Sequence, residues 1–149
     1  MDAAPPAVVV VYERIRRAGS GFERVRPCAE APRYWVGENG TLWRPRKGRL
    51  RRLKQQTNPD GYRRVTLHCG NRKRVSRYVH RLVLLAFVGP CPEGKEACHN
   101  DGNQRNNRLD NLRWDTPKAN AADRIRARYE AESRRKHPHW YDASAPIPL

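Results

Sequence analysis

Two turn signals in the middle of the chain most constrain its fold. An Asn-Gly pair at positions 39–40 lies within the aromatic-rich stretch 34–43, and a Gly-Asn pair at 70–71 separates two Val-, Thr- and Tyr-containing segments, 62–68 and 72–78. Such pairs are typical of hairpin turns, because Asn and Gly tolerate the positive φ angles that these turns need. The sequence therefore predicts two antiparallel hairpins, the second with one solvated face on which a ligand can lie.

The next segments predict a helix and then a strand–loop–strand–helix unit. Apolar residues recur at helical spacing over residues 79–87, and a Gly-Pro pair ends the pattern. Residues 95–99 and 112–115 are predicted strands on either side of a polar, Asn-rich loop. Thr116 and the following Pro then open a helix that continues to about residue 135, because Thr favours the N-cap and Pro the first helical position. The predicted fold class is α+β.

Composition limits the class of partner. The 149 residues are enough for one domain that buries roughly two thirds of its unfolded surface. Lys and Arg number 31 against 15 Asp and Glu, which gives a net charge of +16. Such self-repulsion is tolerated when a polyanion is the partner, so nucleic acid is the first expectation and an anionic membrane surface the second. No apolar run approaches the length of a spanning helix, and the amino terminus lacks the positive segment of a signal peptide.

The cysteines indicate the compartment. Cys28, Cys69, Cys91 and Cys98 form no CxxC pair, so the sequence predicts neither a zinc ribbon nor a dithiol redox site. We therefore expect four thiols in the reducing cytoplasm.

The excess positive charge is confined to one part of the chain. Residues 44–81 hold 14 Lys and Arg against one acid, Asp60, whereas residues 95–120 hold five basic and four acidic residues. Basic side chains on hairpins can follow a phosphate backbone, and the fork of arginine can also read guanine edges. The predicted DNA-binding residues are Arg44, Arg46, Lys47, Arg49, Arg51, Arg52, Lys54, Arg63, Arg64, Arg72, Lys73, Arg74, Arg77 and Arg81.

One constellation in the chain indicates chemistry. His99, Asn111 and Asn120 are spaced 12 and 9 residues apart in the strand–loop–strand–helix unit, within the ordered strings HNDGN, NNRLDNLRW and TPKAN. This pattern resembles the HNH nuclease motif, the ββα-metal fold, of the phage and intron-encoded homing-endonuclease type. The likeness extends back through DGYRRVTLH to YWVGENGTLWR and so covers roughly residues 34–123.

The resemblance implies a role for each residue of the constellation. His99 would be the general base, since the pKa of an unperturbed histidine lies near 6.5, close to working pH. Asn120 would occupy the metal-binding third position, and Asn111 would fix the loop and orient His99. A hard divalent cation held by few protein oxygens, Mg²⁺ or Mn²⁺, would keep open positions for the phosphate and the leaving oxygen.

Cys98 is the position at which the sequence departs from the family pattern. Homing-type enzymes usually carry an acidic metal ligand immediately before the catalytic His, and here a thiol stands in its place. A thiolate suits zinc better than magnesium. Three alternatives stay open: Cys98 ligates a softer metal such as Zn²⁺, it points away while a neighbouring backbone group or Asp101 helps, or the site is weakened.

The resemblance also divides the chain into parts. Residues 1–33 form an extension with a peripheral strand or short helix, 34–90 the β-hairpin DNA-binding region with its short helix, 91–135 the ββα-metal nuclease unit, and 136–149 an irregular tail. The expected function is a metal-dependent endonuclease that nicks double-stranded DNA in the cytoplasm of a bacterial host, and a homodimer could cut both strands. The alternative is a DNA-binding protein with a decayed nuclease centre that acts as a partner in phage DNA processing. RNA is a weaker option, because the sequence lacks the aromatic sheet motif of common RNA binders.

Overall fold

The computed structural model describes residues 14–16 and 22–138. The predicted extension before residue 14 and the tail beyond residue 138 lie outside the described residues. Within the described part the chain is a mixed α+β fold of antiparallel strands and two helices, as the sequence predicts.

The first sheet has five antiparallel strands in sequence order. Their bounds are β1 Arg14–Arg16, β2 Phe22–Pro27, β3 Trp35–Gly37, β4 Leu42–Arg46 and β5 Arg49–Arg52. The predicted hairpin around positions 39–40 is β3–β4, with Val36 opposite Leu42. After β4 the chain turns back as β5 and pairs with it, and this hairpin carries six of the predicted DNA-binding residues: Arg44, Arg46, Lys47, Arg49, Arg51 and Arg52.

The second sheet holds the second predicted hairpin. Its strands are β6 Gln56–Thr57, β7 Arg63–His68 and β8 Arg74–Tyr78, in the order β6-β7-β8. Val65 and Leu67 are buried while Thr66 between them is exposed. This alternation gives the half-solvated sheet that the sequence predicts.

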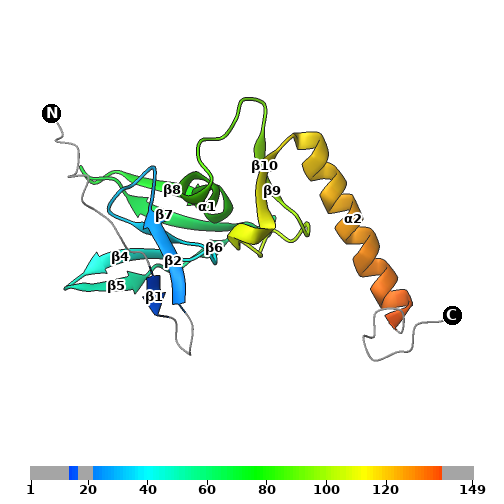
Figure 1. Cartoon of the computed structure of the whole chain (residues 1–149), viewed down its shortest axis with the longest axis horizontal. Coiled ribbons are helices and arrows are strands. Elements are labelled where there is room, and N and C mark those ends of the chain that lie inside the picture. The colour runs from blue at the N-terminus through cyan, green and yellow to red at the C-terminus, as the bar shows by residue number, and fades with distance from the viewer. Residues whose placement is uncertain (1–13, 17–21, 139–149) are drawn as a thin grey trace.

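Helix α1 (Val79–Phe87) joins the sheets into one core. It follows β8 directly, and its buried residues include Leu82, Val83 and Leu84. Together with residues of both sheets and Leu112 these side chains form a single buried cluster. Figure 1 shows α1 next to β7 and β8 on one side and near the β9–β10 hairpin on the other. Burial of this apolar surface is the main favourable term in folding.

The last part is a hairpin followed by a helix. Its elements are β9 Glu96–His99, the 3-10 turn η1 Leu109–Asn111, β10 Leu112–Asp115 and α2 Pro117–Lys136. The side chain of Thr116 caps α2 by accepting a hydrogen bond from the Ala119 amide at 3.2 Å. Beyond its first turns α2 extends away from the rest of the molecule (Figure 1). No helix in the described residues is both long and apolar enough to span a membrane.

The turn between β3 and β4 is held from two sides. The Glu23 carboxylate, only 1% exposed, accepts hydrogen bonds from the Asn39 amide at 2.9 Å and the Thr41 hydroxyl at 2.7 Å. On the other side Gly40 lies against the loop that follows β9. Its φ is +81°, and a β-carbon there would lie 2.8 Å from Cβ and 2.9 Å from the backbone O of Asn107. Only glycine fits this contact.

Replacing Gly40 by alanine tests that contact, with Gly48→Ala as a matched control. Gly48 has a similar φ of +72°, but a β-carbon added there would meet no atom of the described residues within 4 Å. We expect Gly48→Ala to lower the free energy of unfolding by about 1–2 kcal/mol, the cost of a positive φ. Gly40→Ala should lower it by about 2–5 kcal/mol, because overpacking against Asn107 adds to that cost. Urea denaturation measures both, and equal losses would contradict the contact.

Candidate active site

His99 ends β9 and is buried against a neighbouring amide. It is 3% exposed, and its Nε2 lies 2.8 Å from Oδ1 of Asn107. An amide oxygen only accepts hydrogen bonds, so Nε2 carries the hydrogen and donates it. The lone pair of the neutral ring is then on Nδ1. This is the tautomer that leaves one ring nitrogen able to take up a proton.

Burial also sets the charge of His99. Desolvation lowers the pKa of His99 below its usual 6.5 and outweighs the opposing effect of the hydrogen bond with Asn107. The ring is therefore neutral near pH 7. A neutral imidazole with a free nitrogen has the chemistry of a general base.

Asn107 is a residue that sequence reasoning missed as a partner of His99. It is 5% exposed and lies against Gly40, so the β3–β4 turn holds it in place. In the sequence it is one of a pair of loop asparagines, and nothing in its spacing separates it from its neighbour. The contact arises only when the first hairpin packs on the loop.

Asn111 fixes the loop rather than touching His99. Its Oδ1 accepts from the Asp101 amide at 3.1 Å, and its Nδ2 donates to Asp101 Oδ1 at 2.9 Å and to the Asn106 carbonyl at 2.8 Å. Both oxygens of Asp101 are engaged within the same loop, by Asn103 and Asn106. The hydrogen bond that orients His99 is the one that its Nε2 donates to Asn107, and any effect of Asn111 on the ring passes through the loop backbone.

Asn120, in the first turns of α2, faces the hairpin. Its Nδ2 donates a hydrogen bond to Oε1 of Glu96 at 2.5 Å, which leaves the amide oxygen available. Glu96 and Cys98 lie two residues apart on β9 and so share a face of the strand. The structure thus brings together a carboxylate and an amide at the position where the sequence predicts a metal. Sequence reasoning missed Glu96, although its alternation with Cys98 could have indicated it.

Cys98 itself is fully buried. It is 0% exposed, and its thiol donates to the Glu96 carbonyl at 3.5 Å. Burial raises the pKa of the Cys98 thiol; the charge of Arg113 opposes this, and nearby carboxylates such as Glu96 add to it. A protonated thiol is a poor ligand for a hard cation. Among residues 14–16 and 22–138 no group of three or more His, Cys, Asp and Glu side chains gathers to hold a metal ion.

A second histidine lies against His99. His80, on α1, is buried, and its ring centroid is 4.9 Å from that of His99, with Tyr62 packed on both rings. Within the described residues Nδ1 of His80 has no hydrogen-bond partner. Burial, followed by the charges of His99 and Arg81, lowers the pKa of His80 to about 3.

The His80 pKa predicts a loss of stability in mild acid. The pKa of His80 is lower in the folded chain than in the unfolded chain, so the unfolded chain binds the proton first as pH falls. The stability that neutral His80 contributes is therefore complete above pH 6.5 and declines from pH 6.5 toward 3. The slope for His80 is up to about 1.4 kcal/mol per pH unit. Urea denaturation between pH 7.5 and 5.0 should show this slope in the parent protein and a flatter one in His80→Gln. The control His68→Gln, at an exposed position of β7, should keep the parent slope, and equal slopes for all three proteins would contradict the prediction.

Most of the predicted DNA-binding residues lie on the two hairpins, exposed or half-buried. Three of them have a partner within the protein. Arg77 forms an ion pair with Glu30, Arg81 stacks on Trp114 at 5.7 Å, and Arg64 lies over Tyr78 at 5.1 Å. Contact of the set with DNA stays a prediction.

Strand β9 ends in the buried His99, β10 completes the hairpin, and Asn120 of the following helix contacts β9. This arrangement is a ββα unit of the nuclease type. The family model described as HNH endonuclease matches residues 77–122, from the end of β8 to the first turns of α2. The chain belongs to the HNH endonuclease family, as the sequence predicts.

Individual relatives agree with this assignment. The chain is 37% identical over 92 residues to DNA endonuclease I-HmuI of Bacillus phage SP01, covering 62% of this chain and 51% of that protein. It is 34% identical over 91 residues to the SPbeta prophage-derived putative HNH homing endonuclease YosQ of Bacillus subtilis (strain 168), covering 61% and 51%. These matches span about half the length of each relative.

A solved structure gives the same family. The structure titled "DNA binding and cleavage by the HNH homing endonuclease I-HmuI" matches with a TM-score of 0.60 at 30% identity, covering 78% of this chain and 67% of that one. The similarity therefore extends well beyond the ββα unit, into the sheets that precede it.

Proposed function

We propose that this protein is a DNA endonuclease that hydrolyses phosphodiester bonds, with His99 as general base. The observation that carries the proposal is the His99–Asn107 pair, which presents a neutral imidazole with an available nitrogen at the end of a strand. The I-HmuI relative is titled as a protein that binds and cleaves DNA, which supports the same substrate here.

In this mechanism each residue around His99 has a separate role. Nδ1 of His99 takes a proton from the attacking water, while Asn107 holds the other nitrogen in its protonated form. Asn111 and Asp101 keep the loop, and with it Asn107, in a fixed geometry. His80 and Tyr62 pack on the ring and limit its rotation. Such fixed geometry matters because a displacement of about 1 Å can cost a hundredfold in rate.

Glu96 and Asn120 are the residues that would hold a divalent cation. Carboxylate and amide oxygens suit Mg²⁺ or Mn²⁺, and the two side chains are already in contact. Glu96 lies two residues from Cys98 on the same face of β9, so it would take the role of the acidic ligand that the family usually has at the Cys98 position. A bound cation would neutralise charge on the phosphate and the departing oxygen.

The proposal extends to the form of the cut and to its setting. One site of this kind cleaves one strand, so a monomer would nick double-stranded DNA and a homodimer would break both strands. The exposed basic residues of the hairpins would contact the phosphate backbone in the cytoplasm of a host cell. The alternative of an inactive DNA-binding protein is favoured by Cys98 alone, and the contact between Glu96 and Asn120 counts against it.

The nuclease assignment is tested with supercoiled plasmid and Mg²⁺ or Mn²⁺. We expect conversion to nicked circles, and His99→Ala should slow it by about 10²–10⁴-fold, the usual contribution of a general base. His68→Ala, at an exposed position of β7, should cleave at the parent rate. Absence of His99-dependent nicking on every DNA tested would overturn the proposal.

The cation ligands are tested by Mn²⁺ titration calorimetry without DNA. Glu96→Gln should weaken Mn²⁺ binding by about tenfold or more, because charged ligands set the affinity of such sites. Cys98→Ala should change the affinity by no more than about twofold, since a buried thiol at its raised pKa contributes no charge. Circular dichroism verifies that both variants are folded. Loss of binding in Cys98→Ala alone would place the cation on the thiol instead.

A further inference from the structure

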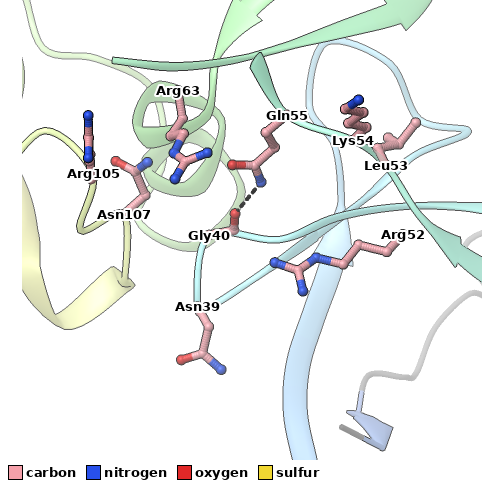
Figure 2. Close-up of a pocket in the computed structure, with 9 residues that line it drawn as sticks. All are labelled: Asn39, Gly40, Arg52, Leu53, Lys54, Gln55, Arg63, Arg105 and Asn107. Atoms are coloured by element: carbon pink, nitrogen blue, oxygen red, sulfur yellow. Dashed lines mark hydrogen bonds between the residues drawn. The ribbon is translucent and has the colours of Figure 1, made fainter. Parts of the chain in front are cut away.

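A pocket next to the candidate active site takes no part in the steps proposed for His99 and the cation. It is open, has a volume of about 480 Å³, and is lined from three parts of the chain: the β3–β4 turn, the segment from Arg52 to Arg63, and the loop that carries Arg105 and Asn107 (Figure 2). Sequence reasoning placed some of these residues in a general basic surface, but it left Arg105 unassigned.

The lining of the pocket is cationic without any balancing acid. Four of its side chains are basic and none is acidic: Arg52, Lys54, Arg63 and Arg105. In the part of the chain that the structure describes, none of the four forms an ion pair with a carboxylate. Four like charges around one concavity repel each other unless an anion lies between them. The pocket is therefore suited to a ligand with more than one negative charge.

The frame of the pocket is fixed before any ligand arrives. The Gln55 side chain donates a hydrogen bond to the Gly40 carbonyl at 2.7 Å, drawn as a dashed line in Figure 2. Gly40 in turn lies against Asn107, and the Leu109 amide donates to the Glu38 carbonyl at 2.7 Å. A site built on such contacts loses little entropy when it binds.

Asn107 connects this pocket to the chemistry. One and the same side chain lines the pocket and holds Nε2 of His99 at 2.8 Å. In Figure 2 Asn107 appears between Arg105 and Arg63. An anion in the pocket is thus separated from the general base by a single residue. The lining offers only Leu53 as an apolar surface, so it is poorly suited to stacking a base.

We propose that this pocket binds backbone phosphates of the DNA strand that is cut, next to the scissile phosphate, and that Arg105 is a principal ligand. That the bound strand is the one that is cut rests on the proposed nuclease function, whereas phosphate binding in the pocket does not depend on it. Charge-assisted hydrogen bonds from arginine to phosphate oxygens would set the register of the strand against His99.

Binding is tested by nuclear magnetic resonance with a short DNA duplex and no divalent cation, so that cleavage plays no part. The backbone amides of Gly40, Gln55, Arg105 and Asn107 should shift, and salt should reverse the shifts. Inorganic phosphate should shift the same amides more weakly and should be displaced by DNA. Phosphate binding without any effect of DNA on these amides would assign the pocket to a small anion and overturn the proposal, as would an absence of shifts with both.

The role of Arg105 is tested with Arg105→Gln and the matched control Arg128→Gln, which removes the same charge from an exposed position of α2. Arg105→Gln should reduce the slope of log affinity against log salt by about 1. It should also lower the single-turnover cleavage rate at saturating protein by about tenfold or more, because the strand loses its register at the site. Arg128→Gln should leave the cleavage rate unchanged, and equal rates for both variants would overturn the placement beside the scissile phosphate.

The two proposals can fail separately. If no DNA is cleaved but the amides shift and Arg105→Gln reduces the salt slope, the pocket is a DNA-phosphate site on a protein that is not a nuclease. If DNA is cleaved while Arg105→Gln changes neither the slope nor the rate, the nuclease function holds and the pocket proposal is wrong.

Discussion

The contact between Gly40 and Asn107 is the constraint on which the rest of the site depends. Asn107 orients His99, and its loop is held internally by Asn111, whereas the position of the loop against the first sheet comes from the packing of Gly40. The β3–β4 turn is rigid enough to serve because the buried Glu23 carboxylate binds both its backbone and Thr41. Glu23, far from His99 in sequence, therefore affects the geometry of the general base: it holds the β3–β4 turn, the turn packs on Asn107, and Asn107 accepts the hydrogen bond from His99.

The surroundings of His99 combine two demands that usually conflict. A base must be neutral near pH 7, which burial favours, yet it must also keep one nitrogen available. Packing against His80 and Tyr62 supplies the burial, and the hydrogen bond to Asn107 fixes which nitrogen keeps its lone pair. The cost is Nδ1 of His80, which has no hydrogen-bond partner among residues 14–16 and 22–138; His80 is a strongly perturbed buried group of the kind that clusters at functional sites.

The parts of the fold that the sequence predicts are those with local signals. Both hairpins, helix α1 and the ββα unit follow from turn residues, apolar spacing and the Thr-Pro cap, and the structure confirms them. The pairing of β2 with β3 and the role of Glu23 could not be predicted, because a Glu between Phe and Arg has the pattern of a solvated strand. Asn107 could not be identified either, because Gly40, which packs against it, comes from another element, whereas Glu96 shares a strand face with Cys98 and so carries a local signal.

The distribution of charge explains how a strongly basic protein can bind DNA and a cation together. Residues 44–81 carry a net charge of +13, whereas residues 95–120 carry only +1. On the β9–β10 hairpin Glu96 lies opposite Asp115, but Arg113 pairs with Asp115 at 2.9 Å and with Asp123 at 2.6 Å, so of these described carboxylates Glu96 is the one without an ion pair. A cation is therefore attracted to Glu96, while Asn107 joins the ring of His99 to the arginine-lined pocket. The cation needs a carboxylate and the DNA phosphate needs arginines, and the chain supplies these two kinds of charge at different residues.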